Sequence, residues 1–251
     1  MSDMWDNRVM ASRKIPFVDG EYYHIYNRGN SKQKIFLDDE DYKHFVQCLF
    51  LANSYRNFKF RDNVVDLKID AFDFKRGDLL VSIGAWVLMP NHFHIYLTPA
   101  EVPSHKSDMW EGKNNVVEFM RKLSTAYAKY FNGKYSRSGS LFEGAFKATH
   151  VEVDTHAKYL FSYIHLNPLK LLNPKWKEDG IGDISLAKEF LKKYQWSSYP
   201  DYLDLERVQE KIISPKKFPP YFTDRNSMHK EIFEWISFPH VGHVGDRKRK
   251  K

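Results

Sequence analysis

The fold is decided by the stretch Trp86-Val87-Leu88-Met89-Pro90-Asn91-His92-Phe93-His94-Ile95-Tyr96-Leu97. It predicts two buried β-strands that are separated by the break at Pro90-Asn91. Residues two apart on a strand share a face, so His92 and His94 project together while Phe93 packs the other way. Two imidazoles at this spacing can hold one divalent metal ion, although paired strand histidines without a ligand role are also common.

The rest of the chain predicts the order strand, helix, strand, strand, helix, strand, and then further helices. The expected strands cover about 22–28, 80–89, 92–97 and 141–153, and the expected helices about 38–54, 116–131, 154–166 and 185–194. This order predicts an α+β fold, a ferredoxin-like (split βαβ) sandwich with an antiparallel central sheet and a C-terminal helical extension. Residues 57–79 are polar and predict a loop or an elaborated hairpin. A fold of this kind does not by itself define a function.

Composition indicates a globular protein with a polyanionic partner. Of 251 residues, 42% are hydrophobic and 16% aromatic, and the net charge is +7. This charge suits nucleic acid first and an anionic membrane second. The single cysteine, Cys48, excludes an internal disulfide and a cysteine-based zinc site. With no signal-peptide layout and no apolar run near the roughly 20 residues of a membrane span, the expected location is the cytoplasm.

The chain divides into three expected parts. Residues 1–15 are expected to form a flexible leader, 16–204 one catalytic domain, and 205–251 a C-terminal extension. The extension ends in the basic run 247–251, which is typical of a solvated tail and less often of a nucleic-acid contact.

A second chemical cluster lies on the helix expected at 154–166. Tyr159, Tyr163 and Asn167 recur every four residues, so they share one helix face. A phenol can attack a phosphodiester, a metal ion can polarise the phosphate, and an amide oxygen can complete the metal's ligand set. The phenol would need a nearby cation or base to lose its proton at neutral pH. The alternative is that both tyrosines simply pack the helix against the sheet.

Five blocks of the sequence resemble the HUH single-tyrosine transposases, especially the REP-associated group. They are Tyr23-His24-Ile25-Tyr26-Asn27-Arg28-Gly29 with Ile35-Phe36-Leu37, the stretch 86–97, Ser140-Leu141-Phe142-Glu143-Gly144-Ala145-Phe146, Tyr163-Ile164-His165-Leu166-Asn167-Pro168 and Trp196-Ser197-Ser198-Tyr199. In order, they span residues 20–200.

This resemblance implies a metal-dependent endonuclease and strand transferase that acts on single-stranded, hairpin-forming DNA. Tyr163 would form a 5′-phosphotyrosine bond and release a 3′-hydroxyl, and joining would be the reverse reaction. His92 and His94 would hold Mg²⁺ or Mn²⁺. Insertion-sequence members often have a glutamine one turn after the tyrosine, where this chain has Asn167 as the third ligand. The resemblance leaves open whether the protein is a monomer or a homodimer.

Several assignments stay open within that hypothesis. Tyr159 and Tyr163 also match the spacing of two-tyrosine HUH enzymes, although the residues after Tyr163 favour it as the nucleophile. His165 points away from the tyrosine face, which favours a structural role. DNA contacts are expected from Asn27, Arg28, Arg121, Lys122, Lys129, Lys134, Arg137 and Lys147.

Two other functions remain as alternatives. The first is a non-catalytic nucleic-acid-binding protein that retains the transposase fold. The second is a metal-dependent hydrolase without a covalent step, which would use the histidines but not Tyr163.

Overall fold

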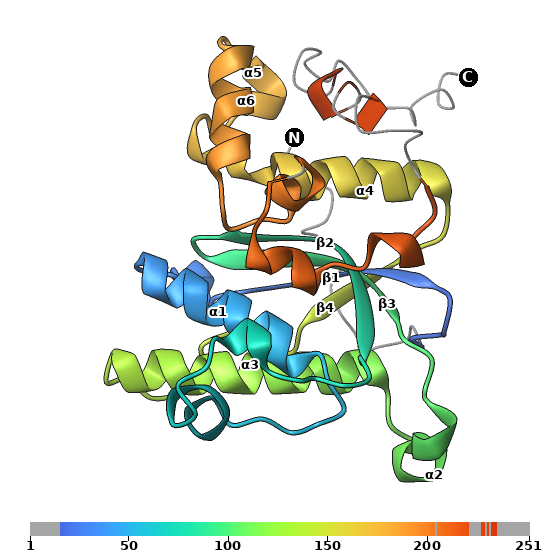
Figure 1. Ribbon diagram of the computed structural model, residues 1–251. Helices are drawn as coiled ribbons and strands as arrows, with labels where there is room; N and C mark the ends of the chain where they lie inside the picture. The colour runs from blue at the N-terminus through green and yellow to red at the C-terminus, as the bar shows by residue number, and fades with distance from the viewer. Residues whose placement is uncertain (1–15, 204, 221–226, 229, 231, 235–251) are drawn as a thin grey trace, which may run out of the picture.

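The computed structural model describes residues 16–203, 205–220, 227–228, 230 and 232–234. A four-stranded sheet lies between two layers of helices (Figure 1). The strands are β1 (Tyr22–Arg28), β2 (Val81–Met89), β3 (His92–Pro99) and β4 (Lys147–Val151). The α-helices are α1 (Asp39–Ala52), α2 (Ser107–Trp110), α3 (Asn115–Lys134), α4 (Asp154–Leu166), α5 (Trp176–Asp179) and α6 (Ile184–Lys193).

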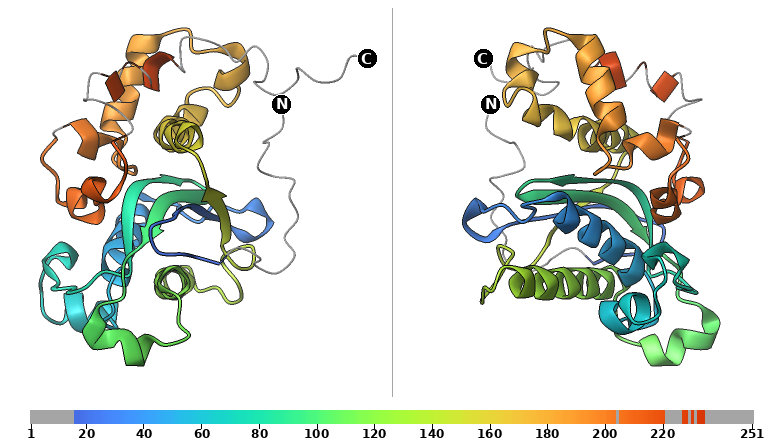
Figure 2. Two further views of the ribbon diagram at one scale, coloured as in Figure 1. Left: turned by 90° about the vertical axis from the view of Figure 1, so that its right-hand side faces the viewer. Right: turned by 60° about the vertical axis from the view of Figure 1, so that its left-hand side comes forward.

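The strand order confirms the predicted ferredoxin-like sandwich. The sheet runs β2-β3-β1-β4, and all three neighbouring pairs are antiparallel. Helices α1 and α3 cover one face, and α4 covers the other (Figure 2). The two strands that carry most of the sequence signal, β1 and β3, are therefore the central pair.

The hairpin β2–β3 forms where Pro90-Asn91 was expected to break the chain. Met89 pairs with His92 across this turn. Every residue of β2 is buried, because the helices cover both faces of the sheet. A strand buried on both sides has no polar alternation, which explains its nearly continuous apolar sequence.

Alternation along the strands divides the core into two parts. Ile25 and Phe93 face α1 and α3, where Phe93 packs 5.1 Å from Phe45 between ring centroids. Tyr96 faces α4 and joins Leu160 in the second core. The same alternation turns His92 and His94 toward the α4 side, since both lie an even number of residues before Tyr96 on β3.

Local signals fix the starts of the helices. Asp38 caps α1, and Asp41 returns the contact in a capping box. Asn114 caps α3 by accepting from two backbone N–H groups. The predicted helices at 38–54, 116–131, 154–166 and 185–194 are all present, within a few residues at each end.

Two segments differ from the simplest expectation. Residues 57–79 form no hairpin but contain two short helical turns, Arg61–Val65 and Ala71–Asp73. Residues 205–220 lie against β2, where Ser214 donates to the carbonyl of Ile83 and Phe218 packs on Gly84. The proposed division near residue 204 stays a prediction. The leader 1–15 and the basic run 247–251 lie outside the described residues.

No helix in the described part of the chain combines the length and the hydropathy that a membrane crossing requires.

Candidate functional site

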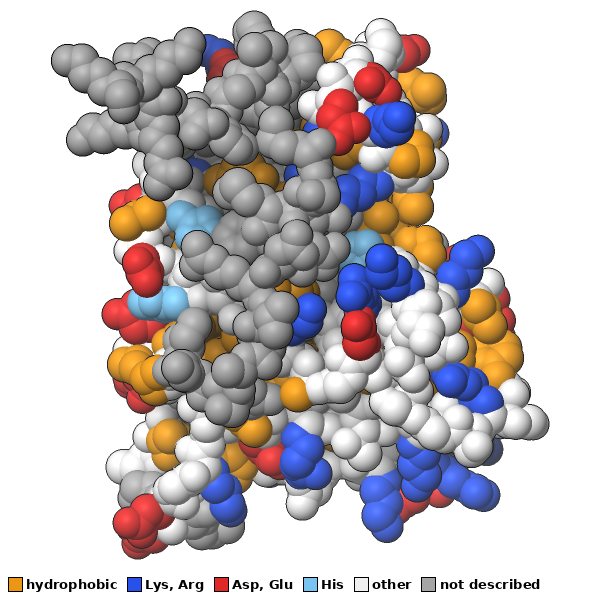
Figure 3. All heavy atoms as spheres, turned by 180° about the vertical axis from the view of Figure 1, so that it is seen from behind, with side chains coloured by type: hydrophobic (Ala, Val, Ile, Leu, Met, Phe, Trp, Pro, Cys, Tyr) orange, Lys and Arg blue, Asp and Glu red, His pale blue; other side chains and the backbone are white. Residues whose placement is uncertain are grey.

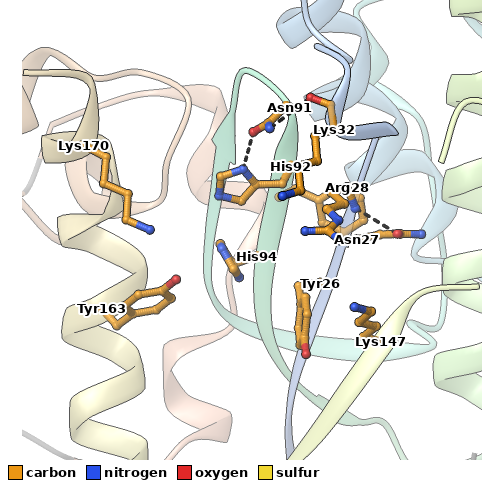
Figure 4. A pocket seen from close by; sticks show the side chains of 11 residues that line it. Tyr26, Asn27, Arg28, Lys32, Asn91, His92, His94, Lys147, Tyr163 and Lys170 are labelled. Carbon is orange, nitrogen blue, oxygen red and sulfur yellow. Dashed lines mark hydrogen bonds between the residues drawn. The ribbon is translucent and has the colours of Figure 1, made fainter. Parts of the chain in front are cut away.

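A cavity of about 260 Å³ opens where β1 ends and β3 begins, beside α4 (Figure 4). It is lined by Tyr26, Asn27, Arg28, Lys32, Asn91, His92, Phe93, His94, Lys147, Tyr163 and Lys170. The structure thus brings together three of the four residues that were expected to do the chemistry. The fourth, Asn167, is not among the lining residues.

The histidine pair lies on the cavity side of β3. The ring centroids of His92 and His94 are 5.1 Å apart, with the planes at 84°. His92 is partly exposed, whereas His94 is 7% exposed. The geometric part of the sequence prediction, that both rings share one face, is therefore confirmed.

A hydrogen bond fixes the tautomer of His92. Its Nδ1 lies 2.6 Å from Oδ1 of Asn91, and the Asn91 Nδ2 donates to the carbonyl of Lys32. Because Asn91 Oδ1 can only accept, His92 Nδ1 carries the proton. The lone pair of the neutral ring is then at Nε2, the nitrogen available to a ligand.

A third histidine, His24 on β1, lies directly behind His94. His24 Nε2 is 2.9 Å from His94 Nδ1, and the rings stack with centroids 5.0 Å apart. Burial lowers the pKa of His24 to about 3. Burial also holds the pKa of His94 well below its usual value, with the charges of His24, His92, Lys170 and Lys177 acting in the same direction. Both rings are therefore neutral at physiological pH.

Tyr163 faces the histidine pair from α4. Its ring meets that of His94 edge-on, with centroids 5.4 Å apart. Two cations flank the phenol: Lys177 Nζ lies 4.4 Å from the ring centroid, and Lys170 Nζ lies 5.9 Å from it. These lysines place positive charge beside the Tyr163 ring.

The other residues considered on this helix lie differently. Tyr159 stacks on Tyr163 with centroids 6.2 Å apart but is not among the cavity residues. Asn167 is 1% exposed, and its amide atoms have no hydrogen-bond partner within the described part of the chain. His165 is fully buried and bonds Ser198 Oγ at 2.8 Å, in keeping with its expected structural role.

A cationic rim forms the other side of the cavity, away from Tyr163 (Figure 4). Arg28 makes a forked ion pair with Glu143 and lowers the pKa of that carboxyl. Lys32 reaches the cavity through a tight turn after Gly29. A Cβ at Gly29 would lie 2.2 Å from the carbonyl oxygen of Gln33, so only glycine fits there.

Five of the expected DNA-contacting cations lie on α3 or directly after it, on the opposite face of the sheet from Tyr163 (Figure 1). They are Arg121, Lys122, Lys129, Lys134 and Arg137. None of the five lines the cavity. Of the expected set, Asn27, Arg28 and Lys147 do line it.

Lys122 was expected to contact DNA but is buried. Lys122 is 6% exposed, and its Nζ donates to the carbonyls of Ser54 and Arg56. It satisfies buried backbone oxygens and is not accessible to DNA. Lys134 is likewise engaged, in ion pairs with Asp38 and Asp41.

The residues fit a metal ion in part. His94 Nε2 is buried without a hydrogen-bond partner in the described part of the chain, as a ligand nitrogen would be before metal binds. The structure describes no group of three or more His, Cys, Asp or Glu side chains placed to hold a metal. Two imidazoles suit Mn²⁺ better than Mg²⁺, and oxygen atoms would have to supply the remaining ligands.

Sequence reasoning missed several residues in or beside the cavity. Lys32 and Lys170 line it, and Lys177 lies against the Tyr163 ring; all three lie in short helical turns, whose direction no periodicity reveals. His24 had a usable signal, because it alternates with Tyr26 and Arg28 on one face of β1. Strand pairing was needed to place it against His94.

No family model matches the sequence, and no curated protein matches it. The solved structures similar to this chain include a REP-associated tyrosine transposase bound to a REP hairpin, with 14% identity, a TM-score of 0.44, and coverage of 80% of this chain and 90% of that one. They also include a candidate transposase from Deinococcus radiodurans, with 15% identity, a TM-score of 0.29, and coverage of 61% and 93%.

Proposed function

We propose that the protein is a metal-dependent single-stranded DNA endonuclease and strand transferase that acts through a 5′-phosphotyrosine intermediate, in the manner of HUH single-tyrosine transposases. The observation that carries the proposal is the meeting of Tyr163 with His92 and His94 in one cavity that also contains four cationic side chains. A protein that only binds nucleic acid needs the cations but neither the buried histidine pair nor a phenol beside it.

The position of the phenol supports a covalent step. The Tyr163 oxygen attacks phosphorus, forming one P–O bond while the bond to the 3′ oxygen breaks. The phenol proton passes to solvent, and the released 3′ oxygen takes up a proton. Lys170 and Lys177 stabilise the negative charge on the attacking oxygen. One phosphoester replaces another, so a 3′-hydroxyl can reverse the step without nucleotide hydrolysis.

The two sides of the cavity have different roles in this reaction. In an in-line displacement, the leaving oxygen departs opposite the nucleophile. Tyr163 and Lys170 lie on one side of the histidine pair. The DNA strand that ends in the 3′-hydroxyl would therefore lie on the other side, against Tyr26, Arg28 and Lys147 (Figure 4).

The face seen in Figure 3 has Lys and Arg side chains gathered mainly in its right-hand half, with a histidine among them.

His92 and His94 would bind the divalent ion through Nε2. When bound, the ion supplies Lewis-acid polarisation of the scissile phosphate. Asn167 remains the proposed third ligand, through its amide oxygen. The substrate is proposed to be hairpin-forming single-stranded DNA.

The decisive experiment incubates the full chain with single-stranded hairpin DNA and Mn²⁺ and resolves the products on a denaturing gel. DNA labelled at its 3′ end should move with the protein, because the tyrosine retains the 5′ phosphate. DNA labelled at its 5′ end should appear as a free fragment that a polymerase can extend. EDTA should abolish both products.

Substitutions test which residue is the nucleophile. Tyr163→Phe should abolish the adduct and leave DNA binding intact, and the matched variant Tyr159→Phe should retain the adduct. An adduct that persists in Tyr163→Phe would assign the attack to Tyr159. Cleavage without any adduct would favour the hydrolase, and binding without cleavage across a hairpin library would favour a non-catalytic protein.

A further inference from the structure

A buried histidine of the central strand β1, His24, has no role in the proposed reaction as described so far. His24 is 2% exposed and is not among the cavity residues, so it contacts neither DNA nor solvent directly. A buried imidazole is costly unless its polar atoms are paired. Its partner is a residue of the proposed metal site, since His24 Nε2 lies 2.9 Å from His94 Nδ1.

We infer that His24 is the positioning residue of the metal site: it accepts a hydrogen bond from His94 Nδ1 and thereby directs the His94 Nε2 lone pair into the cavity. The inference rests on the proposed function, in which His94 binds a divalent ion. Metal-bound histidines commonly donate their second ring nitrogen to such an acceptor, usually a carboxylate or carbonyl. Here a neutral imidazole takes that place.

The direction of this hydrogen bond follows from the surroundings of His94. One proton is shared between the two facing nitrogens, so either ring could donate. If His24 donated, His94 would carry its own proton on Nε2, and if His94 donated, His24 would carry its own on Nδ1. The described residues provide no hydrogen-bond acceptor to either nitrogen, so the number of buried N–H groups without an acceptor is the same for both directions. The positive charges of Lys170 and Lys177 decide between them, because they favour a lone pair over an N–H at His94 Nε2, and Lys170 lines the same cavity as His94.

Packing holds His24 in the required place. Its ring stacks on Tyr26 with centroids 4.9 Å apart and on His94 with the planes at 25°. The pairing of β1 with β3 also brings His24 close to His94, because His24 is opposite Tyr96 and Tyr26 is opposite His94. The ring of His94 is therefore held in place by His24 of β1, a strand that carries none of the proposed metal ligands.

Both proposed ligands are held through their Nδ1 atoms, but by different partners. His92 is held by the side chain of Asn91 in the hairpin turn, and His94 is held by His24 on the neighbouring strand. In both cases Nδ1 is the donor and Nε2 carries the lone pair. A metal ion can then be bound without rearrangement of either ring, which is the purpose of such outer contacts.

Mn²⁺ binding to the full chain without DNA, followed by the electron paramagnetic resonance signal of free Mn²⁺, tests the inference. His24→Phe removes the acceptor and keeps a ring, and we expect the Kd for Mn²⁺ to rise about 10- to 100-fold. His24→Gln places an amide oxygen near the former Nε2 and should restore most of the affinity. His165→Phe is the matched control, because His165 is also fully buried with one side-chain partner, and its Kd should not change.

A second readout needs neither metal nor a variant. The ¹⁵N shifts of the wild-type imidazoles should show His94 with its proton on Nδ1. A His94 ring protonated on Nε2, or a His24→Phe Kd equal to that of the wild type, overturns the inference. If the wild type binds no Mn²⁺ while His94 carries the proton on Nδ1, the metal site of the proposed function fails and the orienting role of His24 stands.

Discussion

At the scale of single residues, the chemistry of the site depends on which side-chain atoms of buried residues lack a protein partner. His94 is almost fully buried, yet one ring nitrogen has no partner in the described part of the chain. Tyr163 is partly exposed and has lysines close to its ring. Such an arrangement costs stability in the absence of a ligand, which is typical of functional sites.

Lys177 should affect the rate of the covalent step more than DNA affinity. It lies closer to the Tyr163 ring than Lys170 and does not line the cavity. Lys177→Ala removes a preorganised charge, so we expect adduct formation to slow about 100-fold. Lys177→Arg should retain most of the rate. Single-turnover adduct formation is the measurement, with exposed Lys175→Ala as the control, and an unchanged rate in Lys177→Ala would refute the role.

At the scale of elements, the strands and helices that carry the site are those with the clearest sequence signals. The alternation in 86–97 placed both histidines on one face, and the four-residue spacing placed Tyr163 on one side of α4. What the sequence did not reveal depends on contacts between elements. The contact between His24 and His94 follows only from the pairing of β1 with β3. Lys122 is buried because residues near the end of α1 accept its hydrogen bonds.

The capping box of α1 makes a prediction for this element. Asp38 accepts from the backbone of Asp41 and also pairs with Lys134 of α3. Asp38→Ala should lower the free energy of unfolding by about 1 kcal/mol, as expected for the loss of an N-cap. Urea denaturation measures this loss. Asp39→Ala, one residue into the helix, should cost less, and equal losses would exclude the cap as the cause.

At the scale of the whole molecule, one core packs on each face of the sheet, and the site lies on the α4 face. Buried neutral histidines in these cores make the free energy of unfolding depend on pH. Burial lowers the pKa of His165 to about 3, so its folded-state pKa lies below the unfolded value. The contribution of neutral His165 to the stability of the folded protein is complete above about pH 6.5. It is lost as the pH falls below that value, because the His165 side chain binds a proton in the unfolded chain before it does so in the folded protein.

We therefore expect the free energy of unfolding to fall between pH 7 and pH 5, with about 2 kcal/mol of the loss due to His165 alone. His165→Gln should reduce the loss by that amount, whatever its effect on stability at pH 7. Urea denaturation at both pH values measures the difference. An identical fall in the wild type and the variant would show that His165 is not the cause.

The order of the site residues along the chain has a consequence for synthesis. The histidine pair belongs to the hairpin β2–β3, whereas Tyr163 follows β4, the last strand to join the sheet. A ribosome-bound chain therefore holds the proposed metal ligands well before it holds the proposed nucleophile. Under the proposed function, sequence order alone keeps an incomplete chain that already carries the histidine pair from forming the covalent DNA adduct.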